Sequence, residues 1–202
     1  MPSRNIVKVY DSNAYYHVYN RGVEKRKIFL DDQDYAVFVS LLKRYLSDKQ
    51  ALDSRGREYL SLAGKVEVVA FCLMPNHFHI LLYQIELGAA TQLLRAVCSS
   101  YVTYFNSKYN RVGALFQGNF KAVRVNSDNY LSYLTRYIHC NPDNYLNYEW
   151  SSLDYWLGNR TASWLNDRAL NDMSPKEYMA FIKDEEKLDS TMENMSEILF
   201  DY

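Results

Sequence analysis

VEVVAFCLMPNHFHILLYQ, residues 66–84, is the densest run of strand-forming residues in the chain. Pro75 cannot donate a hydrogen bond to a sheet, so it divides the run into two antiparallel strands, about 66–73 and 77–84, joined by a tight Met-Pro-Asn turn. Both strands are apolar at nearly every position, as is typical of central strands that helices cover. The stretch therefore predicts a buried hairpin at the centre of the fold.

The segments on either side of this hairpin give an alternating order of elements. Residues 15–22 (YYHVYNRG) predict a first strand and 31–47 an amphipathic helix. After the hairpin, 89–109 predict a long helix, 120–126 (FKAVRVN) a strand, and 127–142 a further helix that starts at Ser127 or Asp128 and ends at an Asn-Pro pair. The order predicts an α+β fold of the ferredoxin-like βαββαβ type, an antiparallel sheet with helices packed on it, followed by an extra helix.

The charge is unevenly distributed along the chain, although the net charge is only −1. Residues 163–202 carry ten acidic and four basic side chains, whereas the remaining 162 residues carry 14 acidic and 19 basic ones. This asymmetry fits a body that binds nucleic acid and an acidic appendage, and a solvated charged tail explains it equally well. We expect a domain over 1–160 and an acidic extension over 161–202, in which 174–187 predict a short capped helix.

Composition also argues against a membrane or disulfide-rich protein. No apolar run approaches the roughly 18 residues of a membrane span, and the N-terminus lacks the apolar segment of a signal peptide. The three cysteines are odd in number and widely spaced, which argues against a disulfide framework. We therefore expect a cytoplasmic protein with no membrane partner.

The second strand of the hairpin carries two histidines one residue apart. Because side chains alternate along a strand, His77 and His79 point to one face while Phe78 and Ile80 point to the other. Two neutral nitrogen ligands then stand side by side, as a divalent metal requires. Taken alone, such a pair is more often incidental than a metal site.

The last predicted helix contains RYIHCNP, residues 136–142, in which Tyr137 and Asn141 are four residues apart on one face. Laid over the two histidines, Asn141 would complete three neutral ligands and leave positions open for phosphate oxygens and water. Tyr137 would attack the phosphorus. Since a free phenol has a pKa of about 10, we expect Mg²⁺ or Mn²⁺ to assist the attack. Core packing explains the tyrosine alone, and a helix end before proline explains the asparagine alone.

Four motifs resemble, in order and spacing, those of the single-tyrosine HUH transposases, a family that includes small insertion-sequence transposases and REP-associated tyrosine transposases. They are MPNHFHILL (74–82), GALFQGNFKAVRV (113–125), RYIHCNP (136–142) and EWSS (149–152), and the resemblance covers about residues 10–156. It implies that His77, His79 and Asn141 bind the metal and that Tyr137 is the nucleophile. It also implies cutting of single-stranded DNA near a hairpin or palindrome through a 5′-phosphotyrosine, with rejoining of ends.

Two departures leave the branch of the family open. Insertion-sequence members usually carry glutamine four residues after the tyrosine, where this chain has Asn141, as in the REP-associated branch. The Gly-Thr-Trp-Tyr motif of many REP-associated members is absent near the first strand. The family acts on DNA, so the resemblance implies a nucleoid-associated protein. The family includes dimers and chains that act alone, so the resemblance leaves both a monomer and a homodimer open. The tyrosine would then act with the histidines of its own chain or with those of a partner.

Basic and amide side chains supply candidates for contacts with DNA. Phosphate contacts are expected from Arg21, Lys25, Arg26, Lys121, Arg124 and Arg136, and base contacts from Gln117 and Asn119. For any single basic residue, a solvated surface charge is an equally good explanation. Lys121 and Arg124 alternate on their strand, so they do not face the same way. Tyr133 is a second candidate nucleophile, and His17 is a candidate for a group behind the metal ligands.

Two other functions compete with the strand transferase. A non-catalytic hairpin-DNA-binding protein that kept the fold would not need His77 for its activity. A metal-dependent hydrolase with water as the nucleophile would tolerate the loss of Tyr137. The second alternative leaves the spacing of Tyr137 and Asn141 unexplained.

Overall fold

We describe a computed structural model of the chain, which covers residues 11–49, 51–125, 128–166 and 173–184. The strands are β1 (Ala14–Arg21), β2 (Val66–Met74), β3 (His77–Gln84) and β4 (Lys121–Val125). The α-helices are α1 (Asp32–Leu46), α2 (Ala89–Lys108), α3 (Asp128–His139), α4 (Leu153–Trp156) and α5 (Pro175–Lys183), and the 3₁₀ turns are η1 (Val23–Lys25) and η2 (Tyr145–Asn147).

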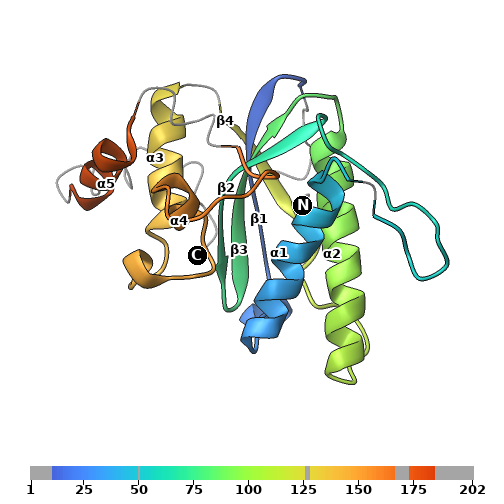
Figure 1. The fold of residues 1–202 in the computed structure, drawn as a ribbon. Helices are drawn as coiled ribbons and strands as arrows, with labels where there is room; N and C mark the ends of the chain where they lie inside the picture. The colour runs from blue at the N-terminus through green and yellow to red at the C-terminus, as the bar shows by residue number, and fades with distance from the viewer. Residues whose placement is uncertain (1–10, 50, 126–127, 167–172, 185–202) are drawn as a thin grey trace, which may run out of the picture.

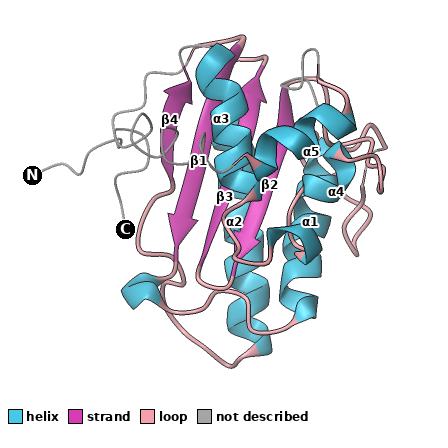
Figure 2. Cartoon of the chain, turned by 90° about the vertical axis from the view of Figure 1, so that its left-hand side faces the viewer, coloured by secondary structure: helices cyan, strands magenta, loops and turns pink. Residues whose placement is uncertain are grey.

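The four strands form one antiparallel sheet in the order β2-β3-β1-β4. Helices α1 and α2 lie on one face, and α3 lies on the other with α4 and α5 beside it (Figures 1 and 2). Each face has its own buried core, because alternate residues of a strand point to opposite sides. The order is that of the ferredoxin-like fold, and the extra helix covers the face that α1 and α2 leave open.

The predicted strands and helices are confirmed, with bounds that differ by at most one residue for β1 to β4, α1 and α2 and by more at the ends of α3 and α5. The hairpin divides at Pro75, as the lack of a proline N–H requires. The third long helix begins at Asp128 and ends at His139, so Asn141 lies just beyond it rather than inside it. Pro142 disfavours helical geometry in Asn141, which keeps that residue out of the helix.

A buried hydrogen-bond network holds the end of α3 against the sheet. The Nε2 of His139 lies 2.7 Å from the hydroxyl of Ser152, and its Nδ1 lies 2.7 Å from the hydroxyl of Tyr178 on α5. Ser152 also accepts the backbone N–H of Phe71 on β2 at 2.8 Å. Because buried polar groups need partners, this network fixes where the helix end sits relative to the sheet.

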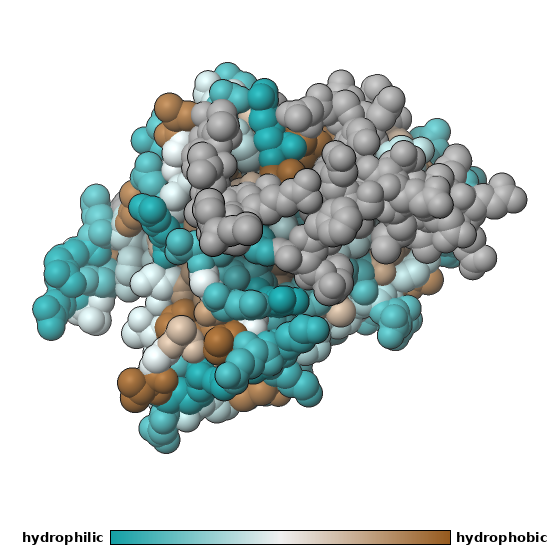
Figure 3. All heavy atoms as spheres, turned by 180° about the vertical axis from the view of Figure 1, so that it is seen from behind, coloured by the Kyte–Doolittle hydropathy of each residue, from teal (hydrophilic) through white to brown (hydrophobic). Residues whose placement is uncertain are grey.

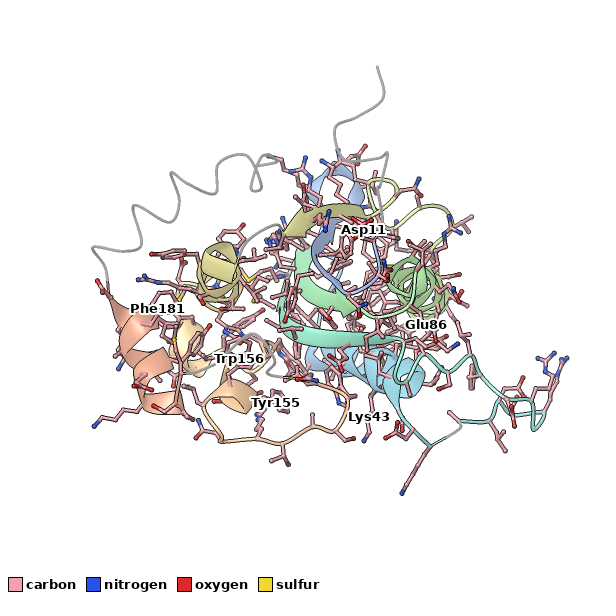
Figure 4. All side chains as sticks on the ribbon, turned by 90° about the horizontal axis from the view of Figure 1, so that it is seen from above. Asp11, Lys43, Glu86, Tyr155, Trp156 and Phe181 are labelled. Atoms are coloured by element: carbon pink, nitrogen blue, oxygen red, sulfur yellow. The ribbon has the colours of Figure 1, made fainter. Side chains whose placement is uncertain are left out.

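Helix α5 packs against the outer side of α3. Its first turn is closed by a capping box between Ser174 and Glu177. Tyr178 and Ile182 are buried, and the ring of Phe181 lies 5.8 Å from the ring of Tyr133 on α3. Figure 4 shows Phe181 on the side of α5 that faces α3. The predicted capped helix is therefore present, while residues 185–187 of that prediction lie outside the described part of the chain. The domain boundary after residue 160 stays a prediction.

Candidate active site

The site forms on the sheet face that α3 covers. Register pairs Tyr19 of β1 with His79 of β3, and Arg21 with His77. Since side chains two apart on a strand share a face, His17, Tyr19 and Arg21 point to the same side as the two histidines. The last turn of α3 brings Tyr137 onto this face, and Asn141 follows just after the end of the helix.

His77 lies between two asparagines. Its Nδ1 is 2.7 Å from the Oδ1 of Asn76, and its Nε2 is 3.3 Å from the Oδ1 of Asn141. An amide oxygen only accepts, so the proton of a neutral imidazole belongs on Nδ1, where the bond is shorter. The Nε2 of His77 and the Oδ1 of Asn141 are then two acceptors that face each other.

His79 lies deeper, among other rings. Its ring is 5.0 Å from that of His77 and nearly perpendicular to it, and 5.3 Å from the ring of Tyr137, edge to face. Its Nδ1 is 2.9 Å from the Nε2 of His17. Tyr137 is only 7% exposed and packs in the core beneath α3. The predicted nucleophile and the predicted ligands therefore meet within one chain.

Burial keeps both histidines neutral at ordinary pH. Burial lowers the pKa of His77. The oxygen of Asn141 opposes this effect, because it can accept a hydrogen bond from the protonated ring, and the charge of Arg21 adds to it. Burial also lowers the pKa of His79 well below its usual value, with smaller contributions from His17 and His77. A neutral imidazole is the form that binds metals, so protons do not compete for these nitrogens near pH 7.

The residues present fit a divalent cation. Neighbouring ligands of an octahedral Mg²⁺ lie about 3 Å apart, and a cation would relieve the two facing acceptors of His77 and Asn141. Within the described ranges no group of three or more His, Cys, Asp or Glu side chains is placed to hold a metal, so the third protein ligand would be the Asn141 amide. Three neutral ligands hold Mg²⁺ or Mn²⁺ weakly, which suits an ion shared with phosphate oxygens.

Three of the predicted DNA contacts, Arg21, Gln117 and Lys121, border this site. Arg21 donates from Nε to the Oε1 of Gln117, and the Nζ of Lys121 lies 5.8 Å from the ring centre of Tyr19. Burial lowers the pKa of Lys121, and the charge of Arg21 lowers it further. Two cations and an amide therefore stand beside the histidines on the same face.

The other predicted DNA contacts are spread more widely. Arg124 belongs to the opposite face of β4 and forms an ion pair of 2.8 Å with Asp11. Lys25 and Asn119 are exposed, and half-buried Arg26 lies 4.0 Å from Glu24. These positions leave Lys25, Arg26 and Asn119 on the periphery, and Arg124 away from the site.

Arg136 lies where sequence reasoning did not place it. Only 1% of the residue is exposed, its Nη2 donates to the backbone oxygen of Asp184, and its guanidinium stacks 5.3 Å from the ring centre of Phe181. Helix α5 therefore covers it, and it is not available for a surface contact with phosphate. Nothing in the local pattern RYIHCNP shows that a later helix packs over this position.

Sequence reasoning also missed one partner of a site residue and one group that holds α3 in place. The sequence pattern places Asn76 only in the turn, although its position directly before His77 is a usable signal. Ser152 enters only within EWSS as a point of resemblance, whereas the structure makes it the group that joins α3 to β2. No signal in the sequence alone links Ser152 to His139.

Acid should destabilise the metal-free protein through its histidines. Burial lowers the pKa of His17 and of His139 to about 3, and the pKa values of His77 and His79 are lowered too. In the unfolded chain each binds a proton near pH 6.5. The unfolded state therefore binds more protons as pH falls below 6.5, and stability declines by up to about 1.4 kcal/mol per pH unit for each histidine.

Urea unfolding with EDTA at pH 8.0, 6.5, 5.5 and 5.0 measures this loss before most carboxylates titrate. We expect a plateau above pH 7 and a steady fall below pH 6.5. Stability that is constant or rising from pH 6.5 to 5.0 would contradict the neutral, buried state of these side chains.

The chain matches the model of a known family over most of its length. The model of the IS200-like transposase family matches residues 10–141, which include both histidines, the tyrosine and the asparagine. The chain belongs to the IS200-like transposase family. No curated protein matches it. None of the helices in the described part of this transposase-family chain is long and apolar enough to cross a membrane.

One solved structure shares this fold. A REP-associated tyrosine transposase bound to a REP hairpin matches with a TM-score of 0.56 and 14% sequence identity, over 86% of this chain and 96% of that one. A candidate transposase from Deinococcus radiodurans R1 matches with a TM-score of 0.40 and 13% identity, over 64% of this chain and 89% of the other. The first likeness supports the fold of this IS200-like chain, and the second is too low to support a conclusion.

Proposed function

We propose that the chain is a metal-dependent strand transferase that nicks single-stranded DNA near a hairpin or palindrome and rejoins the ends. The observation that carries the proposal is the meeting of Tyr137 and Asn141 with the face that holds His77 and His79. Membership of a transposase family and a fold shared with a hairpin-bound transposase support it. A protein with this role works at the nucleoid.

The side chains divide the chemistry among them. His77, His79 and Asn141 would hold Mg²⁺ or Mn²⁺, which supplies positive charge to polarise the scissile phosphate. Packing holds the ring of Tyr137 against His79, so the phenol is oriented before DNA arrives. The more exposed His77 and Asn141 mark the side from which the phosphate reaches it.

The proposed cut is an exchange of one phosphoester for another. The oxygen of Tyr137 forms a bond to phosphorus and its proton passes to solvent, while the bond from phosphorus to the 3′-oxygen breaks and that oxygen takes up a proton. The products are a 5′-phosphotyrosine and a free 3′-hydroxyl. A second 3′-hydroxyl reverses the step and releases Tyr137, so no external energy source is needed.

The test is a protein–DNA adduct that survives denaturation. The full chain is mixed with Mn²⁺ and single-stranded oligonucleotides that carry the palindromes flanking its gene, and the adduct is sought on a denaturing gel. An adduct supports the transferase. Cleavage without an adduct would favour the hydrolase, and tight hairpin binding with no cleavage would favour the non-catalytic binder.

The cations beside the site give a separate prediction for DNA binding. Arg21 and Lys121 stand on the active-site face, so Arg21→Gln and Lys121→Gln should each weaken binding and lower the slope of log K against log salt by about one. Fluorescence anisotropy with a labelled hairpin at 50–300 mM salt measures both effects.

Arg124→Gln is the matched control, because Arg124 is on the same strand as Lys121 but faces the other way. It should leave the affinity and the slope near those of the parent chain. A larger effect for Arg124→Gln than for Lys121→Gln would place the DNA on the opposite face.

A further inference from the structure

We propose that His17 and Asn76 are positioning residues that fix the tautomer of the two metal-ligating histidines. This inference rests on the proposed function of the site and deepens it. Each histidine has its Nδ1 tied to a partner, at 2.9 Å for His79 with His17 and at 2.7 Å for His77 with Asn76.

A neutral imidazole carries one proton, on either Nδ1 or Nε2. A histidine that binds a metal through Nε2 must carry its proton on Nδ1, and a hydrogen-bond acceptor at Nδ1 selects that form. Asn76 presents an amide oxygen, which can only accept. His17 presents its Nε2, which accepts when its own proton is on Nδ1. The two partners would therefore prepare both ligands in the same way.

The surroundings of His17 support a positioning role. The residue is fully buried, and its Nδ1 has no hydrogen-bond partner among the described residues. When its Nε2 accepts from His79, the proton of His17 sits on this unpaired nitrogen. A buried ring nitrogen without a partner costs stability whether or not it carries the proton, because it has lost its hydrogen bonds to water. A core that only needed packing would use an apolar ring here, so the imidazole points to a task at Nε2.

The rings around His17 restrict its freedom to turn away. Its ring lies end to end with that of His79 and nearly in the same plane, with 5.1 Å between ring centres. The ring centre of Tyr19 is 5.2 Å away, and that of Tyr137 is 6.2 Å away with the two rings nearly perpendicular. His17 thereby links the ligand to the tyrosine ring through packing. The role that we assign to His17 is exerted through His79, so it is a positioning residue.

The first readout needs neither metal nor DNA. Nitrogen-15 NMR of the metal-free chain at pH 8 distinguishes the two neutral tautomers of each histidine. We expect the Nδ1–H form for His77 and His79. The variant His17→Phe keeps an aromatic ring without an acceptor, so His79 should lose this preference, whereas His17→Gln supplies an amide oxygen and should restore it.

The second readout is the affinity for Mn²⁺ alone, measured by titration calorimetry. His17→Phe should raise Kd by about 10- to 100-fold, and His17→Gln should stay within a few-fold of the parent chain. Tyr16→Phe is the control, because Tyr16 is buried on the same strand but faces α1 and α2, where it contacts Asp11. It should change neither the tautomer nor Kd.

Other results would overturn the inference. An Nε2–H form of His79 in the parent chain would do so, as would an Mn²⁺ affinity of His17→Phe equal to that of the parent. If His17→Phe does not fold, Asn76→Leu applies the same two measurements to His77. The tautomers are read without DNA, so a chain that forms no adduct can still pass this test, and failure here leaves the adduct test standing.

Discussion

Tyr137→Phe removes the covalent adduct with single-stranded DNA and lowers nicking by on the order of 10³-fold or more. The change deletes one oxygen and keeps the ring that packs against His79, so the site should remain assembled. Hairpin binding should stay near the parent value, since the ring does not carry the charges that attract DNA. A denaturing gel and an anisotropy titration measure the two properties on the same preparation.

Tyr133→Phe is the matched control for this variant. Tyr133 lies one helical turn earlier, and its ring packs against Phe181 of α5 rather than against the histidines. Its loss should leave the adduct intact. If Tyr137→Phe forms the adduct and Tyr133→Phe does not, the nucleophile has been assigned to the wrong tyrosine, and an adduct with both variants would exclude this helix as its source.

Removing one metal ligand should lower nicking because the site binds less metal, and DNA binding should be unchanged. His77→Ala and Asn141→Ala each delete a group from the pair at 3.3 Å, so the Kd for Mn²⁺ should rise by more than about 100-fold. Nicking should fall with metal occupancy and recover in part at high Mn²⁺. EDTA should stop the parent chain reversibly.

Asn144→Ala controls for the loss of an amide near the end of α3. Asn144 is exposed three residues after Asn141 and lies in the loop before η2. Its replacement should leave the Mn²⁺ affinity unchanged. Nicking that is undiminished in His77→Ala would refute a catalytic metal at this position and revive the non-catalytic reading of the two histidines.

The fold could be read from the sequence because local rules and the long-range pattern agree. Pro75 marks the hairpin, and the spacing of apolar residues separates strands from helices. Which face of the sheet each helix covers is harder to predict from the sequence. That α3 lies opposite α1 and α2 follows from where the apolar sides of β1 and β3 point after pairing, and pairing is a contact between distant segments.

In the site too, local spacing predicts some features, while others depend on contacts between distant segments. His77 and His79 share a face by the period of a strand, and Tyr137 and Asn141 were placed together by the period of a helix. The helix ends two residues before Asn141, yet the amide still reaches His77. The partnership of His17 with His79 depends on the β1–β3 register, and the burial of Arg136 depends on α5. Neither can be obtained from spacing along the chain.

The hydrogen bonds of His139 to Ser152 and Tyr178 bear on how many DNA ends one molecule handles. The bond to Ser152 ties the end of α3 to β2, and the bond to Tyr178 ties it to α5 of the same chain, so on the proposed function each copy would carry one site with one nucleophile. One tyrosine can hold one 5′ end at a time. With one such site in each copy, joining two broken ends would proceed as successive single-strand events in one molecule or would need a second molecule.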